Sequence, residues 1–203
     1  MAGSCVSARW RCKNNFTEEE IDTDYEIRKS NFKISNRDNS IVTIMTIDKE
    51  EEFIIVGTKK GSLIIYVVAE EKVIFYKMIH SHIKKINNIY INSTLNMFID
   101  YSDDNYINLY TLPNAEITHS IYEKNINFVL LSNSPLPCFI TYSNEDKLFK
   151  CYNVNGKELI KLEIDEGVHN PFIYTSKNFV DYLVYKSDYE KLIIRKFPYL
   201  NED

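Results

Sequence analysis

The chain has 203 residues, of which 44% are hydrophobic and 26% charged, and its formal net charge is −5. This length is enough for one good-sized core, and the composition is that of an ordinary globular protein. The acidic balance disfavours a nucleic-acid-binding domain, which usually carries a basic excess. We therefore expect a globular protein that binds no nucleic acid.

The sequence carries no sign of secretion or of membrane insertion. It has no apolar run long enough to cross a membrane, and its N-terminus lacks the apolar core of a signal peptide. Lys59-Lys60 and Lys84-Lys85 are interpreted as solvated turn residues rather than as a phospholipid patch, which would need several more charges. The four cysteines form no C-x-x-C pair. We expect a cytoplasmic protein in which Cys138 and Cys151 are buried thiols within strands.

The N-terminal part of the chain has no clear hydrophobic period. Residues 1–31 are expected to form a tail that is disordered or contains a short helix, and residues 17–26 within it are an acidic run. The globular part is expected over residues 32–203. The 15 Tyr and 11 Phe of the chain favour strands there.

Four units of short strands follow in chain order, separated by polar turns. The first unit, 41–80, is expected to contain strands at 41–47, 53–57, 62–68 and 72–77. The second, 82–122, is expected to contain strands at 87–91, 97–101, 106–112 and 116–122. The third, 126–164, is expected to contain strands at 126–131, 138–142, 147–153 and 158–163. The fourth, 168–200, has strands at 172–175, 179–185 and 191–197, and no room for another.

The units are similar to one another in sequence. Residues 97–112 align with residues 53–68 without a gap at an offset of 44 positions (97 − 53). Residues 138–154 follow the same pattern with one inserted residue, and residues 181–197 follow it more weakly. Self-similarity at roughly 40–45 residues, with several strands per unit, is typical of propeller blades. The predicted fold class is all-β, a partial β-propeller of about four four-stranded blades. We interpret it as the end of a larger polypeptide or as the product of a truncated gene model, and we expect an uncovered face at each end.

The second unit resembles a blade of the WD-repeat proteins. His82 precedes the first strand where that family has a Gly-His pair, and Tyr110 stands where it has Trp. Residues 102–105, Ser-Asp-Asp-Asn, are similar to the Ser-x-Asp-Gly turn of such blades. The resemblance implies a buried hydrogen-bond network of His82, Ser102, Asp104 and Tyr110. In the first unit Lys60 occupies the position of Asp104, so no complete network is expected there.

The last units resemble the C-terminal WD-repeat end of BEACH-domain proteins, and the resemblance covers about residues 41–200. It is carried by Asn155-Gly156-Lys157 and by the closing Ile-Arg-Lys-Phe-Pro-x-Leu at 194–200. It implies a non-catalytic scaffold for vesicle trafficking or membrane dynamics, whose propeller loops bind proteins. It also implies a BEACH domain, absent from this chain, in the full-length polypeptide. The cytoplasmic chain would then be peripheral on vesicle membranes, through its partners.

Two other functions remain open. The chain could be another WD-repeat adaptor subunit of a multi-protein complex. It could also be a propeller enzyme with residues gathered at a central channel, which converging His, Asp and Glu with perturbed pKa values would favour.

No pattern in the sequence predicts a catalytic, cofactor or metal site. Neither a G-x-S-x-G elbow nor a phosphate-binding loop occurs. His80 and His82 have no third metal ligand at a fitting spacing. Asp103-Asp104 and residues 144–146 lack the alternating oxygen ligands and the glycine of a calcium loop, so turn chemistry accounts for them.

Overall fold

The computed structural model describes residues 39–48, 52–69, 72–132, 138–178 and 180–197. In that part of the chain, 15 β-strands and one short 3-10 helix form the secondary structure, and the strands make four antiparallel sheets. The all-β class predicted from the sequence is confirmed. The predicted tail over residues 1–31 lies outside the described residues.

Each sheet is a meander in which neighbouring strands follow one another in the chain. The first sheet contains β1 (Val42–Ile47), β2 (Phe53–Thr58), β3 (Ser62–Ala69) and β4 (Lys72–His80). The second contains β5 (Ile86–Asn92), followed by the 3-10 helix η1 (Ser93–Leu95), and β6 (Met97–Ser102), β7 (Tyr106–Thr111) and β8 (Ile117–Tyr122). The third contains β9 (Ile126–Leu131), β10 (Cys138–Ser143), β11 (Leu148–Asn153) and β12 (Glu158–Glu163). The fourth contains β13 (Val168–Thr175), β14 (Asp181–Ser187) and β15 (Leu192–Phe197), so it has three strands, as expected.

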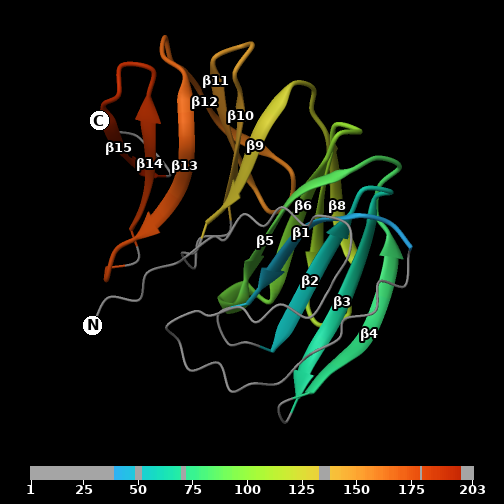
Figure 1. Cartoon of the computed structure of the whole chain (residues 1–203). Helices are drawn as coiled ribbons and strands as arrows, with labels where there is room; N and C mark the ends of the chain where they lie inside the picture. The colour runs from blue at the N-terminus through green and yellow to red at the C-terminus, as the bar shows by residue number, and fades with distance from the viewer. Residues whose placement is uncertain (1–38, 49–51, 70–71, 133–137, 179, 198–203) are drawn as a thin grey trace.

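The four sheets stand side by side in an arc, with the first and the last at its two ends (Figure 1). The first strands of consecutive sheets contact one another: β1 contacts β5, β5 contacts β9, and β9 contacts β13. The first strands therefore gather toward a common axis, as the blades of a propeller do. Over the described residues the sheets form an open arc rather than a closed ring.

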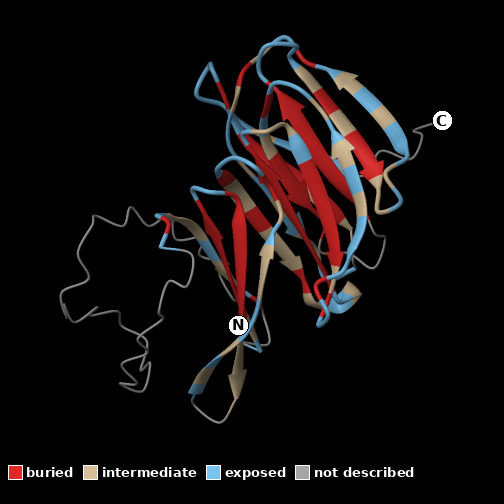
Figure 2. Ribbon diagram, turned by 90° about the vertical axis from the view of Figure 1, so that its right-hand side faces the viewer, coloured by how far each residue is buried: buried red, intermediate tan, exposed pale blue. Residues whose placement is uncertain are grey.

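The two middle sheets bury both of their faces against neighbours. In β6, Ile99 and Tyr101 pack against the third sheet, in a cluster that includes Phe139. Side chains alternate along a strand, so Phe98 lies on the other face, where it packs against the first sheet in a cluster that includes Ile55. Figure 2 shows the buried residues concentrated in the inner strands. Each middle sheet thus forms one side of two apolar layers, one layer on each of its faces.

The two ends of the arc differ in how far their outer faces are covered. On the last sheet, four large apolar side chains are between 51% and 67% exposed: Phe172, Tyr174, Leu192 and Ile194. On the first sheet, Ile54, Val56, Ile64 and Tyr66 of the inner strands β2 and β3 are buried, whereas Met45 and Ile47 of the edge strand β1, which pair with Val56 and Ile54, are 41% and 51% exposed. Flanking side chains of the same sheet, Phe75 and Met78 among them, pack against this cluster. Exposed apolar side chains therefore lie on the outer faces of both end sheets, on the first and third strands of the last sheet and on the edge strand β1 of the first.

Left-handed backbone at tight turns is provided largely by asparagine. Asn96, Asn105 and Asn125 have φ values of 48°, 69° and 60°, which asparagine adopts more readily than most residues do. The chain has five Gly, and two of these, Gly61 and Gly156, also have positive φ, 88° and 75°.

Gly61 lies where the first sheet meets the segment leading to the second, and it has no room for a side chain. A Cβ at Gly61 would lie 2.1 Å from the carbonyl oxygen of His82. A Cβ at Gly156 would come no closer than 3.4 Å, to Ile121. The backbone strain of an alanine is common to both positions, whereas the steric clash is specific to Gly61.

We predict that Gly61→Ala lowers the free energy of unfolding by more than Gly156→Ala. The left-handed backbone should cost each variant about 1–2 kcal/mol. The clash in Gly61→Ala should add about 1–3 kcal/mol, because backbone must move to relieve it. Urea unfolding of both variants measures the difference. Equal losses would contradict the close contact between Gly61 and His82.

Candidate functional site

Residues 81–85 form the linker between the first and second sheets, and hydrogen bonds hold this linker from both sides. The backbone N–H groups of Ser81 and His82 donate to the Gly61 carbonyl oxygen at 3.1 and 2.9 Å. On the other side, the Asp103 N–H donates to the Lys85 carbonyl oxygen at 3.0 Å. The linker is therefore fastened to the β2–β3 turn and to the β6–β7 turn.

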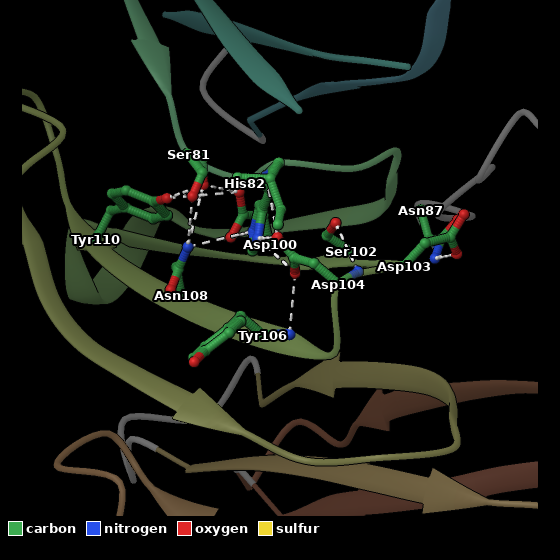
Figure 3. Close-up of polar contacts among 11 residues, drawn as sticks. Ser81, His82, Asn87, Asp100, Ser102, Asp103, Asp104, Tyr106, Asn108 and Tyr110 are labelled. Atoms are coloured by element: carbon green, nitrogen blue, oxygen red, sulfur yellow. Dashed lines mark hydrogen bonds and ion pairs between the residues drawn. The ribbon is translucent and has the colours of Figure 1, made fainter. Parts of the chain in front are cut away.

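The imidazole of His82 bridges two carboxylates of the second sheet (Figure 3). Its Nε2 lies 3.0 Å from Asp100 Oδ1, in the middle of β6. Its Nδ1 lies 3.0 and 3.1 Å from the two carboxylate oxygens of Asp104, in the β6–β7 turn. The side chains of His82, Asp100 and Asp104 are 1%, 0% and 6% exposed. The ion pairs are thus closed off from solvent.

Ser81, Asn108 and Tyr110 complete the cluster on the side of Asp100. Ser81 Oγ donates to Asp100 Oδ2 at 2.8 Å and is also hydrogen-bonded to the Tyr110 hydroxyl. Asn108 Nδ2 donates to Ser81 Oγ at 3.1 Å. The Tyr110 ring is fully buried and stacks on Phe98, with ring centroids 4.4 Å apart. The polar cluster therefore rests directly on the apolar layer between the first two sheets.

Asp104 also orders the backbone around it. Its carboxylate accepts hydrogen bonds from the N–H groups of Ile83 and Tyr106, each at 3.1 Å. Its own N–H donates to Ser102 Oγ at 3.2 Å. One carboxylate thus joins the linker to the start of β7.

The four residues predicted for the network take different places in it. His82 and Asp104 are in direct contact, and Ser102 contacts the backbone of Asp104. Tyr110 bonds to Ser81 and lies 3.5 Å from Asp100, so it reaches His82 only through these residues. Three members were missed in the sequence: Ser81, Asp100 and Asn108. A signal for Asp100 existed, because a lone carboxylate within the apolar strand Met97–Ser102 needs a buried partner.

Burial and charge shift the pKa values in this cluster. Burial alone would lower the pKa of His82, but Asp100 and Asp104 outweigh it and hold the pKa above its ordinary value of 6.5. Burial raises the pKa of Asp100, against the effect of His82. Burial alone would also raise the pKa of Asp104, but the N–H groups of Tyr106 and Ile83, together with His82, lower it. Burial and the nearby Asp100 raise the pKa of Tyr110.

The arrangement leaves little chemistry available. Both ring nitrogens of His82 face carboxylates, so neither is directed at a metal ion. Among the described residues there is no group of three His, Cys, Asp or Glu placed to hold a metal. In the β10–β11 turn, Asp146 bonds to Ser143 of the same turn, with Ser143 Oγ 2.7 Å from Asp146 Oδ2. The cluster fixes backbone positions instead of presenting reactive groups.

The next two linkers are also hydrogen-bonded to the sheet that follows them, through different residues. Glu123, just before β9, accepts hydrogen bonds from Lys150 Nζ at 2.5 Å and from the Tyr152 hydroxyl at 3.0 Å. Glu166, just before β13, accepts a hydrogen bond from the Tyr185 hydroxyl at 3.2 Å. Each of the three linkers therefore gives a polar side chain to the sheet that it precedes. The two glutamates were not predicted from the sequence.

A second buried polar chain joins the sheets at the opposite ends of the strands. Asn92 Nδ2 donates to the Ser132 carbonyl oxygen at 2.6 Å, and Ser132 Oγ donates to the Asp181 carboxylate. Thr175 Oγ1 donates to the same carboxylate at 2.6 Å. Asn92, Ser132 and Asp181 are 3%, 0% and 1% exposed. This chain connects the second, third and fourth sheets, and its members come from separate units, so no local motif reveals it.

Comparisons with known proteins support the fold and name no family. No protein-family model matches the chain. No curated protein matches it either. Among solved structures, the computationally designed Ika8 protein is similar to this chain with a TM-score of 0.58 and 11% identity, over 77% of this chain and 46% of that one. The chain thus spans less than half of the designed protein. At this identity the likeness concerns the fold alone.

In the described part of the chain, no helix is long and apolar enough to span a membrane. This finding agrees with the sequence, where no apolar run of that length occurs.

We predict that His82 stabilises the fold more at pH 6 than at pH 9. Because its pKa is raised above 6.5 on folding, the folded chain holds more protons than the unfolded chain as the pH rises past that value. Stability therefore falls with rising pH. At pH 6, His82→Gln should cost about 3–5 kcal/mol, because it leaves Asp100 buried without its charged partner. At pH 9 the cost should be smaller.

His169→Gln is the matched control, since the His169 side chain is 55% exposed and pairs with Asp188 at the surface. Solvent should keep its cost below about 1 kcal/mol. Urea unfolding of the unmodified chain and of the two variants, at both pH values, measures the free energy of unfolding of each. A His82→Gln cost that is the same at both pH values, or larger at pH 9, would contradict a protonated bridge.

Proposed function

We propose that this chain is a non-catalytic scaffold that binds other proteins. The observation that carries the proposal is the closure of the polar cluster: the side chains of His82 and Asp100 are 1% and 0% exposed. Their polar atoms find partners inside the chain, so a substrate has no reactive group to approach. A satisfied buried network of this kind makes the loops that carry it rigid.

The rigid loops display apolar side chains at one end of the sheets. In each meander, the turn between the second and third strands lies at the same end as the linker to the next sheet; we call this end the linker rim. Large apolar side chains on it are between 43% and 86% exposed: Ile83, Tyr106, Tyr122 and Tyr189. The rings of Tyr106 and Tyr122 lie 5.2 Å apart. Aromatic side chains on a rigid base are typical anchors of protein interfaces.

Within this proposal, the chain is the C-terminal propeller portion of a BEACH-type protein that serves vesicle trafficking or membrane dynamics. The support is the resemblance of residues 41–200, in which Asn155-Gly156-Lys157 forms the β11–β12 turn with Gly156 at a φ of 75°. The chain would work in the cytoplasm and reach vesicles through its partners. Sequencing the transcript upstream of this region tests the assignment. A frame encoding a BEACH domain would support it, and a frame encoding another domain would contradict it.

Two alternatives make different demands on the chain. Another WD-repeat adaptor would use the same linker rim but would lack a BEACH domain. An enzyme is favoured by the raised pKa values of His82 and Asp100, because shifted titrations often mark active sites. Catalysis would require the linker of residues 81–85 to open, and its hydrogen bonds to Gly61 and Asp103 oppose this. The scaffold therefore remains the proposal.

We predict that replacing Tyr106 and Tyr122 by serine removes partner proteins without unfolding the chain. Both side chains are about half exposed, at 43% and 52%, so their loss should cost little stability. Tyr76→Ser is the matched control, because Tyr76 is 44% exposed on β4, away from the linker rim. Proteins captured from source-cell extract are identified and quantified by mass spectrometry.

The proposal expects at least one protein captured in stoichiometric amount by the unmodified chain and by Tyr76→Ser, and lost from the double variant. Identical sets of captured proteins for all three would contradict the use of the linker rim.

A further inference from the structure

The outer face of the last sheet, which we call the last face, is of the kind that meets a following sheet. Inside the arc, each sheet turns one face to the sheet before it and the other to the sheet after it. In β6, Phe98 faces the first sheet and Ile99 faces the third. Counted back from the serines that end β6 and β14, Ser102 and Ser187, Ile99 corresponds to Val184. Val184 lies on the last face, which is therefore equivalent to the side of the second sheet that packs against the third.

The outer face of the first sheet, which we call the first face, is of the other kind. β2 ends at Thr58 as β6 ends at Ser102, so Ile54 corresponds to Phe98. Ile54 lies in the cluster on the first face, and Ile47, which pairs with it, is 51% exposed there. Faces of these two kinds pack against each other at all three interfaces inside the chain. The first face and the last face are therefore matched to each other.

Apolar side chains extend across all three strands of the last face. The strand register places Phe172 beside Val184, and Val184 beside Ile194. Tyr174 and Leu192 lie two residues from Phe172 and Ile194 along the same strands, so they point to the same side. A contiguous exposed apolar surface usually marks an interaction site. This surface continues the apolar layers that already hold the four sheets together.

Charges at the two faces are of opposite sign. Lys196 is exposed two residues after Ile194 and lies on the last face. Lys186 of the same face is paired with Glu190. Glu52 is exposed immediately before β2 and continues the pairing with β3, so strand alternation places it on the first face. Both Lys196 and Glu52 lie at the ends of the strands opposite the linker rim, so stacking of the two faces would bring them to the same end.

We propose that two copies of this chain pair head to tail, with the last face of each packed on the first face of the other. One chain supplies four sheets in an open arc (Figure 1), and propellers typically have four to eight blades. Two copies bring eight sheets (2 × 4), the one larger multiple of four within that range. Closed two-fold pairing covers both end faces of each copy. It forms two contacts for a single loss of free motion.

This pairing goes beyond the proposed function, because it concerns how copies assemble and not what the linker rim binds. In a closed ring the linker rims of both copies face the same side. A partner with two binding sites would then bind the pair more tightly than it binds a single chain. Because the pair dissociates on dilution, the first and last faces are open in the single chain and covered in the pair.

Sedimentation equilibrium of the full chain, at concentrations between about 1 and 100 μM, tests the proposal. We expect single chains and pairs, without larger species. Two double variants charge one face each: Leu192→Lys with Ile194→Lys on the last face, and Met45→Lys with Ile47→Lys on the first. All four side chains are between 41% and 67% exposed. Each double variant should weaken pairing by roughly 100-fold or more, because it buries lysines without partners.

Ile117→Lys is the matched control, since Ile117 is 52% exposed on β8 of the second sheet, which is not an end sheet. It should pair as the unmodified chain does. Urea unfolding checks that each variant is folded, and the single substitutions Ile194→Lys and Ile47→Lys replace a double variant that fails to fold.

An equal mixture of the two double variants, with a fluorescent label on one of them, separates head-to-tail pairing from pairing of like faces. A mixed pair has one contact in which both faces are intact, so labelled chains should pair in part with unlabelled ones.

Pairing that is lost in both double variants, kept in Ile117→Lys and partly restored in the mixture supports the proposal. A chain that stays single at the highest concentration, or one that grows into larger oligomers, would overturn it. Loss in the last-face variant alone would also overturn it, by assigning the contact to two last faces. The measurement uses no partner protein, so its failure is distinct from failure of the partner capture at Tyr106 and Tyr122.

Discussion

The structure depends on one constraint: a four-stranded sheet with apolar side chains on both faces cannot bury them alone. Phe98 and Ile99 are neighbours on β6 and point to opposite faces, and each is almost completely buried. Phe98 needs the first sheet and Ile99 needs the third. Burial of one such side chain is worth about 1.5–3 kcal/mol. Stability is therefore a sum over neighbouring sheets, as in other repeat proteins.

Apolar contact between sheets does not by itself set how far one sheet slides or turns on the next. Directional bonds at the linkers can do so. His82 joins the linker to Asp100 and Asp104, while Gly61 holds the same linker to the first sheet. In the next two linkers, Glu123 and Glu166 likewise accept hydrogen bonds from the sheet that follows, with other partners. These bonds also fix the loops of the linker rim, and the proposed binding surface depends on loops that hold their position.

The strands could be predicted from sequence because they follow a regular rule. Alternating apolar residues, polar turns and the offset of 44 positions between the first two units are local signals. Contacts between units have no such signal. Asp100 was not predicted, because the resemblance to WD-repeat blades points to Asp104 in the turn. The hydrogen bonds that link Asn92, Ser132 and Asp181 were not predicted, because the three residues belong to three different units.

Hydrogen exchange of the native chain, measured for each strand, tests the stacking of the sheets most directly. Both faces of the second and third sheets are covered, whereas the outer face of the last sheet leaves Phe172 and Ile194 51% and 61% exposed. The account predicts that amides of β6 and β10 exchange slowest and that amides of β13 to β15 exchange first, as a group. If the last sheet were protected as strongly as the second and third, burial by neighbouring sheets would not be what holds this chain together.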